Sequence, residues 1–270
     1  MRRSFYLLFA VVTMAFFTAC SGGSQKSSKS TTKIQKEEVK DDVKKVVYPL
    51  PTSFEVTEML NRIEASYILN LSNDPGNVDN YITEKEKALA LGIYGADLSY
   101  ASTYHQKQRT IDYMSVSKKL LEELDIAAAV EPDIIDKIEN AENDKDKLVE
   151  IITNSFYSTY EYLNNNDRGA VSLLVLSGSW IEALYIATHI SDETFDNKEM
   201  VTIIMNQKEN LNKLMVLLDK YKANQSVAET IAILTPLSEI YKSVDAGSIT
   251  LKQMKEIAAS VETAREKILK

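Results

Sequence analysis

Apolar side chains recur at intervals of three or four residues along most of this chain, from about residue 52 to its end at residue 270. Residues 144–163 illustrate the pattern, because one helical face carries Leu148, Ile152, Phe156 and Leu163. No segment shows sustained strand-like alternation, and the chain has only eight glycines and five prolines. The pattern predicts an all-α fold, a multi-helix bundle of about eight longer helices joined by short connections.

Capping signals predict where some of these helices begin. A Thr followed three residues later by Glu or Gln has the spacing of a capping box. The spacing occurs at Thr52 with Glu55, Thr83 with Glu86, and Thr250 with Gln253. We therefore expect helices over about 52–70, 83–105 and 250–270, and the apolar pattern adds another over about 109–128.

The most apolar segment is residues 170–190, AVSLLVLSGSWIEALYIATHI. Its 21 residues are close to the ~20 that a membrane-spanning helix needs. However, Glu182 lies near its middle, and no run of basic residues flanks it. Because a carboxylate at mid-bilayer is costly and rare, we predict a central buried helix of a soluble bundle.

Two segments of the chain match at an offset of 85 residues, LGIYGADLSYAS (91–102) and LSGSWIEALYIA (176–187). The alignment places Asp97 on Glu182, Tyr100 on Tyr185, and Tyr104 on His189. Each segment is followed by a long Lys-containing amphipathic stretch. This similarity predicts an internal duplication of a helical hairpin. Small residues form a stripe in each copy, which predicts close helix packing: Ala88, Gly92 and Ala96, and then Ser179, Ala183 and Ala187.

The matching positions define a candidate polar pocket. One helical face carries Asp97, Tyr100 and Tyr104, and the other carries Glu182, Tyr185 and His189. A buried carboxylate must be hydrogen-bonded, paired or protonated, and tyrosine or histidine side chains are suitable partners. Three interpretations remain open: a structural hydrogen-bond network, which we favour, a pocket for a cationic or hydroxyl-bearing small molecule, and a catalytic pair of carboxylates.

Other signals of chemistry are weak. The two histidines, His105 and His189, lie far apart, and neither belongs to a zinc-binding motif. GxSxG, GxGxxG and P-loop motifs are absent from the sequence. We therefore assign no catalytic residue, no metal ligand and no cofactor, and we lean against an enzyme.

The N-terminus has the organisation of an export signal. A basic start, MRRSF, precedes an apolar run from Tyr6 to Phe17, and FTAC then ends at Cys20. This segment resembles the lipobox of bacterial lipoproteins, of the Bacteroidales envelope type, with Phe17 where Leu is usual. The resemblance implies that residues 1–19 are a signal peptide. It also implies that Cys20 carries diacylglycerol on its thiol and an acyl chain on its amino group.

Cys20 is the only cysteine in the chain, so an intramolecular disulfide is excluded. Lipidation would give this thiol a role, and the alternative is an ordinary secreted protein with an incidental cysteine. Several acyl chains, each contributing about 0.8 kcal/mol per buried CH₂, would anchor the chain permanently to a membrane.

Residues 20–51 are expected to form a lipidated cysteine and a flexible tether, followed by a single all-helical domain over residues 52–270. Residues 21–47 are rich in Ser, Thr, Lys and acids and have almost no apolar pattern. A flexible chain of that length reaches roughly 30 Å. Ser and Gly follow Cys20, whereas surface-exported lipoproteins of the type it resembles carry an acid cluster there. The resemblance therefore favours a domain that faces the periplasm.

Removing Arg2 and Arg3 with the signal peptide leaves 29 basic and 39 acidic residues, a net charge of −10. That charge argues against nucleic acid or anionic headgroups as main partners. We predict a non-catalytic binding or scaffold domain, anchored by Cys20 in the outer membrane and facing the periplasm, with an envelope protein as partner. The alternative is a small-molecule binder or hydrolase-like enzyme that uses the face around Asp97 and Glu182.

Overall fold

The computed structural model describes residues 66–270 apart from 142–143, 192–193 and 246. All of them belong to the second of two compact units, Val39–Lys270. The expected signal peptide, Cys20, the tether and most of the helix expected over 52–70 lie outside the described residues. At the described end of that expected helix there is no α-helix, because Leu69–Leu71 forms a single 3-10 turn.

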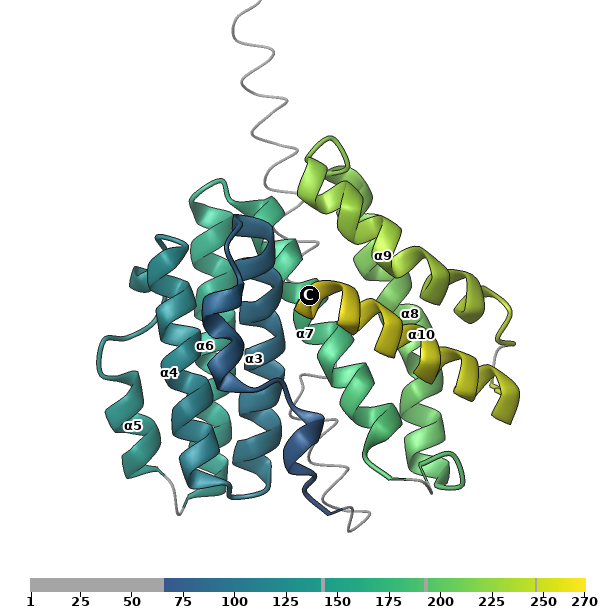
Figure 1. Ribbon diagram of the computed structural model, residues 1–270, viewed down its shortest axis with the longest axis horizontal. Helices are drawn as coiled ribbons and strands as arrows, with labels where there is room; N and C mark the ends of the chain where they lie inside the picture. Colours follow the sequence, from purple (N-terminus) through teal and green to yellow (C-terminus); the bar gives the residue numbers. More distant parts are fainter. Residues whose placement is uncertain (1–65, 142–143, 192–193, 246) are drawn as a thin grey trace, which may run out of the picture. The chain divides into compact units, whose positions relative to one another are not determined.

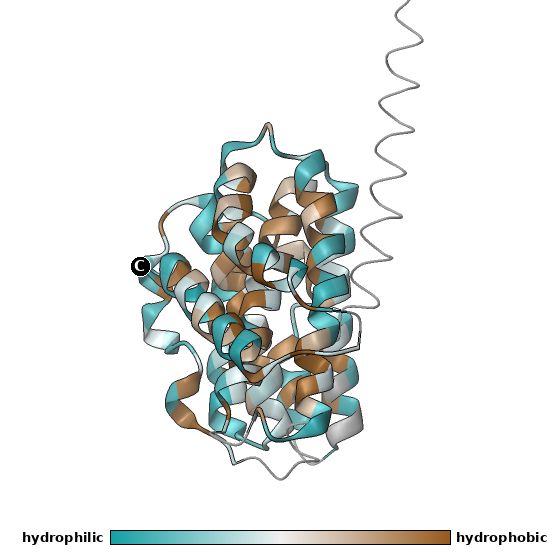
Figure 2. Cartoon of the chain, turned by 90° about the vertical axis from the view of Figure 1, so that its right-hand side faces the viewer, coloured by the Kyte–Doolittle hydropathy of each residue, from teal (hydrophilic) through white to brown (hydrophobic). Residues whose placement is uncertain are grey.

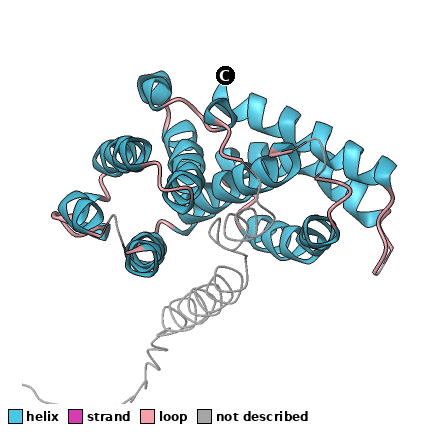
Figure 3. Ribbon diagram, turned by 90° about the horizontal axis from the view of Figure 1, so that it is seen from below, coloured by secondary structure: helices cyan, strands magenta, loops and turns pink. Residues whose placement is uncertain are grey.

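The described residues contain eight α-helices and three short 3-10 helices but no strand, which confirms the all-α prediction (Figure 3). The 3-10 helices are η1 (Leu69–Leu71), η2 (Pro75–Asn80) and η3 (Ala127–Ala129). The α-helices are α3 (Glu84–Thr103), α4 (Lys107–Glu123), α5 (Ile134–Asn140), α6 (Lys145–Asn165), α7 (Gly169–His189), α8 (Lys198–Lys220), α9 (Gln225–Lys242) and α10 (Leu251–Leu269).

The helix starts agree with the capping signals that lie within the described residues. Thr83 and Thr250 each form a complete capping box, with Glu86 and Gln253 respectively. The helix expected over 109–128 was predicted too long, since α4 ends at Glu123.

The early end of α4 coincides with a reversal of the chain at Asp125. Asp125 adopts a left-handed conformation with φ 56°, and the Ile126 N–H bonds to the Leu121 carbonyl at 2.8 Å. This reversal turns the chain so that Ile126 is fully buried against the helices.

Helices α3 and α7 lie in near backbone contact at the centre of the bundle. A Cβ built on Gly92 would lie 2.0 Å from the Val175 carbonyl oxygen, and one on Gly178 would lie 2.0 Å from the Leu89 oxygen. The close approach predicted for Gly92 is therefore confirmed, and its neighbours on α7 include Ser179 of the predicted stripe, whereas Gly178, which comes equally close to α3, is outside that stripe. Residues about 85 apart face one another, so the two helices run in the same direction (Figure 1).

The remaining helices are grouped around this pair, with α4 to α6 on one side and α8 to α10 on the other (Figure 1). In the first half α4 packs on α3, and α6 returns to contact α3 and α7. In the second half α8 packs on α7, and α10 returns to contact α7 and α3. This repeated order of packing is consistent with the predicted duplication.

Hydropathy follows the packing, because the apolar sides of the helices turn inward and the polar sides outward (Figure 2). Within the described part of the chain, α7 alone is long and apolar enough to cross a membrane. However, 83% of its apolar window is buried inside the bundle, and the core helix of a soluble protein meets the same criterion. Its packing thus agrees with the predicted central helix.

Residues 66–83, here called the entry segment, lead the described chain into α3. The segment contains η1 and η2 and buries Val78 and Tyr81 against the core. The Tyr94 hydroxyl on α3 donates to the Asp74 carbonyl at 3.0 Å. These contacts hold the entry segment beside the middle of α3, where the candidate site lies.

Candidate functional site

Asp97 on α3 and Glu182 on α7 come together inside the bundle. Both side chains have no exposed surface. The carboxyl group of Glu182 is within interaction range of Asp97, both as a charge and as a hydrogen-bond partner. The two acids at matching positions of the proposed repeat therefore do face one another.

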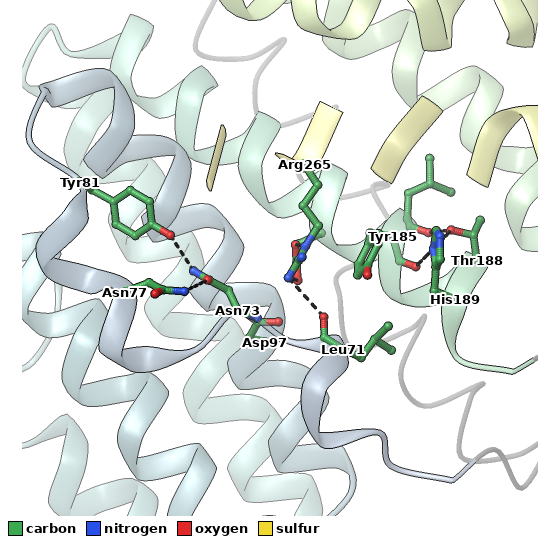
Figure 4. Close-up of polar contacts among 11 residues, drawn as sticks. Leu71, Asn73, Asn77, Tyr81, Asp97, Tyr185, Thr188, His189 and Arg265 are labelled. Atoms are coloured by element: carbon green, nitrogen blue, oxygen red, sulfur yellow. Dashed lines mark hydrogen bonds and ion pairs between the residues drawn. The ribbon is translucent and has the colours of Figure 1, made fainter. Parts of the chain in front are cut away.

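Arg265 from α10 forms an ion pair with Glu182. Its Nε donates to Glu182 Oε2 at 2.5 Å, and its Nη2 donates to Oε1 at 2.8 Å, which is a two-pronged ion pair. Nη2 also donates to the Leu71 carbonyl at 3.2 Å (Figure 4). The guanidinium lies 4.2 Å from the centre of the Tyr185 ring, a cation–π distance.

The pKa of Arg265 reflects two opposing effects. Burial, the largest single effect, lowers it, but the charge and hydrogen bonds of Glu182 together with the nearby Asp97 and Tyr185 raise it, so the net shift is upward. Arg265 therefore stays charged, and its side chain is only 13% exposed. A cation that is mostly removed from water must be compensated, and Glu182 provides the compensation.

One carboxyl oxygen of Asp97 has a hydrogen-bond donor, and the other has none among the described residues. Its Oδ2 accepts from the Asn73 N–H at 3.1 Å, whereas Oδ1 as a carboxylate oxygen has no donor among the described residues. Burial raises the pKa of Asp97 well above its usual range, and the charge of Glu182 raises it further, outweighing the opposing effects of Arg265 and the Asn73 N–H. Both observations favour a protonated Asp97, whose hydroxyl can donate to the adjacent Glu182 carboxylate.

The cluster of Asp97, Glu182 and Arg265 is then electrically neutral as a whole. It contains one neutral acid, one anion and one cation. A neutral, hydrogen-bonded group of this kind can stay buried without an external counter-ion.

The entry segment completes the surroundings of Asp97. Asn73 Nδ2 donates to the Tyr81 hydroxyl at 2.9 Å, and Asn73 Oδ1 accepts from Asn77 Nδ2 at 2.9 Å (Figure 4). The backbone N–H of Asn73 is thus held where it meets the carboxyl group.

The tyrosines predicted beside Asp97 have other partners. The Tyr100 hydroxyl accepts from the Ile68 N–H at 2.8 Å, and its ring centre lies 4.8 Å from that of Tyr67 and 5.1 Å from that of Tyr104. Burial raises the pKa of Tyr104 to about 12. Together these rings form an aromatic cluster that packs the entry segment against α3.

Of the two corresponding residues of α7, one contacts the cluster of charged residues and the other does not. Tyr185 lies under Arg265, but His189 stacks on Tyr185 with ring centres 4.3 Å apart. Its Nδ1 lies 2.9 Å from both the Tyr185 carbonyl and the Thr188 hydroxyl. Of the six candidate residues, the structure therefore brings Asp97, Glu182 and Tyr185 to the cluster. Tyr100 and His189 bond elsewhere, and Tyr104 packs its ring in the aromatic cluster while its hydroxyl has no hydrogen-bond partner among the described residues.

Sequence reasoning missed Arg265, Asn73 and Leu71. One available signal concerned Arg265, because the other basic residues of α10 are lysines. Arg is the residue better suited to buried, two-pronged pairing with a carboxylate. No comparable signal marked Asn73 or Leu71, which contribute backbone groups.

Within the described part of the chain, no group of three or more His, Cys, Asp or Glu side chains could hold a metal ion. Two surface hollows lie on the α3–α6 side of the described residues, and none of the six candidate residues lines either one. The hydrogen bonds that the structure gives to the two acids come from Asn73 and Arg265 of the same chain.

No protein-family model matches the sequence, and no curated protein or solved structure matches it either. Function is therefore argued from the chain's own residues.

Proposed function

We propose that this chain is a lipid-anchored protein of the bacterial cell envelope whose helical domain faces the periplasm and acts by binding a protein partner, not by catalysis. The sequence basis is the lipobox-like FTAC ending at Cys20, the polar stretch after it and the acidic composition. The observation that carries the non-catalytic part is the closure of Glu182 by Arg265.

The two-pronged ion pair uses both oxygens of Glu182, and the proposed proton of Asp97 is directed at the same carboxylate. A substrate would have to displace Arg265 to reach Glu182, and Asp97 has no exposed surface. The arrangement supports a structural network, the interpretation favoured from the sequence.

The entry segment also suits a tethered domain. Its backbone is bonded to buried groups at Ile68, Leu71 and Asn73, through Tyr100, Arg265 and Asp97 respectively. A pull on the preceding tether would therefore act on bonds that reach the centre of the bundle.

The anchor is tested with Cys20→Ala in the full chain. We expect the wild-type protein in the membrane fraction and the variant in the soluble fraction, with Ser21→Ala as a matched control that remains membrane-bound. Retention of Cys20→Ala in membranes would overturn the lipid anchor.

The binding role is tested by crosslinking in intact envelopes, followed by purification of the chain. We expect a reproducible protein partner that is lost when the same crosslinking is done after the envelope is dissolved in detergent. Recovery of lipids alone would contradict the proposed partner.

The second candidate is a small-molecule binder or hydrolase-like enzyme that uses Asp97 and Glu182. The raised pKa of Asp97 beside an acidic neighbour is the observation in its favour, because such pairs also occur in active sites. Asp97→Asn combined with Glu182→Gln distinguishes the two ideas. Loss of a ligand with folding intact supports the pocket, whereas loss of stability supports the structural network.

A further inference from the structure

A hollow lies between α3, α4 and α6, on the side of α3 that faces α6. Its space is about 450 Å³, which includes the open region at its mouth. The floor is apolar and buried, and it includes Leu98, Met114, Leu121 and Ile152. We refer to it as the α4–α6 hollow.

The mouth is formed by residues that are only partly buried, Val130, Ser155 and Phe156. The Phe156 ring occupies the place that a side chain at residue 95 would need, since a Cβ built on Gly95 would lie 2.1 Å from Phe156 Cε2. Phe156 is therefore seated in the mouth by the absence of a side chain at Gly95. A rotation of this ring would change the width of the opening.

One polar atom in the hollow lacks a partner. Ser117 Oγ is buried and has no hydrogen-bond partner among the described residues. The other two hydroxyls of the lining are satisfied, because Ser155 donates to the Ile151 carbonyl at 2.8 Å and Thr159 donates to the Ser155 carbonyl at 2.9 Å. Since leaving a buried hydroxyl unpaired is unfavourable, a partner from outside the chain would stabilise Ser117.

We propose that the α4–α6 hollow binds a small, mainly hydrocarbon molecule with one hydrogen-bonding group, of which an aliphatic alcohol is the simplest example. The apolar floor takes the hydrocarbon part. Ser117 Oγ is buried beneath the lining, and rotation of this side chain about its Cα–Cβ bond brings the hydroxyl to the polar group of the ligand. Small-molecule sites have this composition, with apolar walls and a few placed polar groups. The site is separate from the Asp97–Glu182 cluster, and it does not depend on the proposed anchor.

The test uses a 1-octanol analogue that carries a diazirine, irradiated with the full chain, and labelled peptides identified by mass spectrometry. Local labelling separates binding in the hollow from general adsorption. We expect labels on α3, α4 and α6 that excess 1-octanol suppresses. Ser117→Ala removes only the hydroxyl, and losing one such hydrogen bond should weaken the competition by 1-octanol about fivefold.

Ser117→Leu fills the floor and should abolish the labels, whereas Ser115→Leu, on the exposed side of the same helix, should leave them unchanged. Thermal unfolding of each variant verifies that it is folded. If Ser117→Leu does not fold, the result with Ser117→Ala alone tests the proposal. Equal labelling of the wild type and Ser117→Ala at every concentration of competitor would overturn the proposal. So would labels spread over helices outside the hollow.

Discussion

At the scale of single residues, Arg265 differs from the other cations of the chain. Most ion pairs among the described residues lie at the surface, such as Lys222 with Asp219, where both side chains are about two-thirds exposed. Pairs of that kind contribute about 0–1 kcal/mol. The partner of Arg265 is fully buried, so the loss of either member leaves an uncompensated group away from water.

Arg265→Met is expected to lower the free energy of unfolding by about 3–5 kcal/mol, because Glu182 would remain buried without its cation. Urea denaturation measures the change. Lys267→Met, two residues further along α10 and exposed, is the matched control and should stay within about 0.5 kcal/mol of the wild type.

Adding Glu182→Gln to Arg265→Met should restore part of the lost stability, since the buried anion is then removed. If Arg265→Met lowers the free energy of unfolding by less than about 1 kcal/mol, the ion pair with Glu182 contributes no more than a surface pair does.

Asp97 makes stability depend on pH. Its pKa is near 3.8 in the unfolded chain and raised in the folded one, so the folded state keeps a proton that the unfolded state releases. The stabilisation is complete below about pH 3.8, the unfolded-state pKa, and is lost as pH rises through the folded-state pKa. Asp97→Asn cannot titrate, and its amide can imitate the protonated acid by donating to Glu182 and accepting from the Asn73 N–H.

We therefore expect the stability of the wild type relative to Asp97→Asn to fall as pH rises from 4 to 8, measured by urea denaturation at each pH. Asp219→Asn, which replaces an exposed acid, serves as the matched control substitution. A wild-type-minus-variant difference that is constant over this range would show that Asp97 is not protonated in the fold.

At the scale of helices, the contact between α3 and α7 depends on missing side chains. Gly inside a helix costs about 0.5–1 kcal/mol relative to Ala, so an intrinsic gain is expected from replacing it. At Gly92 the neighbours of an added Cβ are backbone atoms of Val175 and Ser179, which cannot move without moving α7. At Gly95 the neighbour is the movable ring of Phe156.

Gly92→Ala is expected to destabilise the protein by about 1–3 kcal/mol, because overpacking outweighs the gain in helix propensity. Gly95→Ala is the matched variant on the same helix and should cost clearly less, since Phe156 can rotate. Thermal unfolding compares the two. Equal or reversed effects would argue against the close α3–α7 contact.

At the scale of the whole described fold, one guanidinium connects three distant parts of the sequence. Arg265 in α10 bonds Glu182 in α7 and the Leu71 carbonyl in the entry segment. Both ends of the described chain are thus attached to the same central helix. We infer that the entry segment and α10 undergo local unfolding together.

Hydrogen exchange of Arg265→Met checks this inference. Amide exchange should become faster in both the entry segment and α10, while α6, which has no bond to Arg265, should change little. Faster exchange confined to α10 would mean that the two ends are held independently.

The sequence was informative wherever neighbouring residues decide the outcome. The capping boxes at Thr83 and Thr250 were read correctly, and so was the central place of residues 170–190. The end of α4 was misjudged, because the reversal at Asp125 depends on burying Ile126 against helices that are distant in sequence.

The pairing of Asp97 with Glu182 could be anticipated from the offset of 85 residues. The groups that bond to the two acids could not be anticipated. Helical spacing assigns a side chain to a face and does not say which distant helix will cover that face. Arg265 is 83 residues from Glu182, and Asn73 and Leu71 act through backbone groups that every residue possesses.

By itself, the sequence determined the helical class, the local helix starts and the two matching acids, because these follow from spacing along one chain. Only the tertiary structure decided that the acids are closed by Arg265 and that a hollow with an unpaired Ser117 lies between α3, α4 and α6. The physical reason is the same for both features. Burial and pairing depend on which helix packs on which, and that depends on all the helices at once.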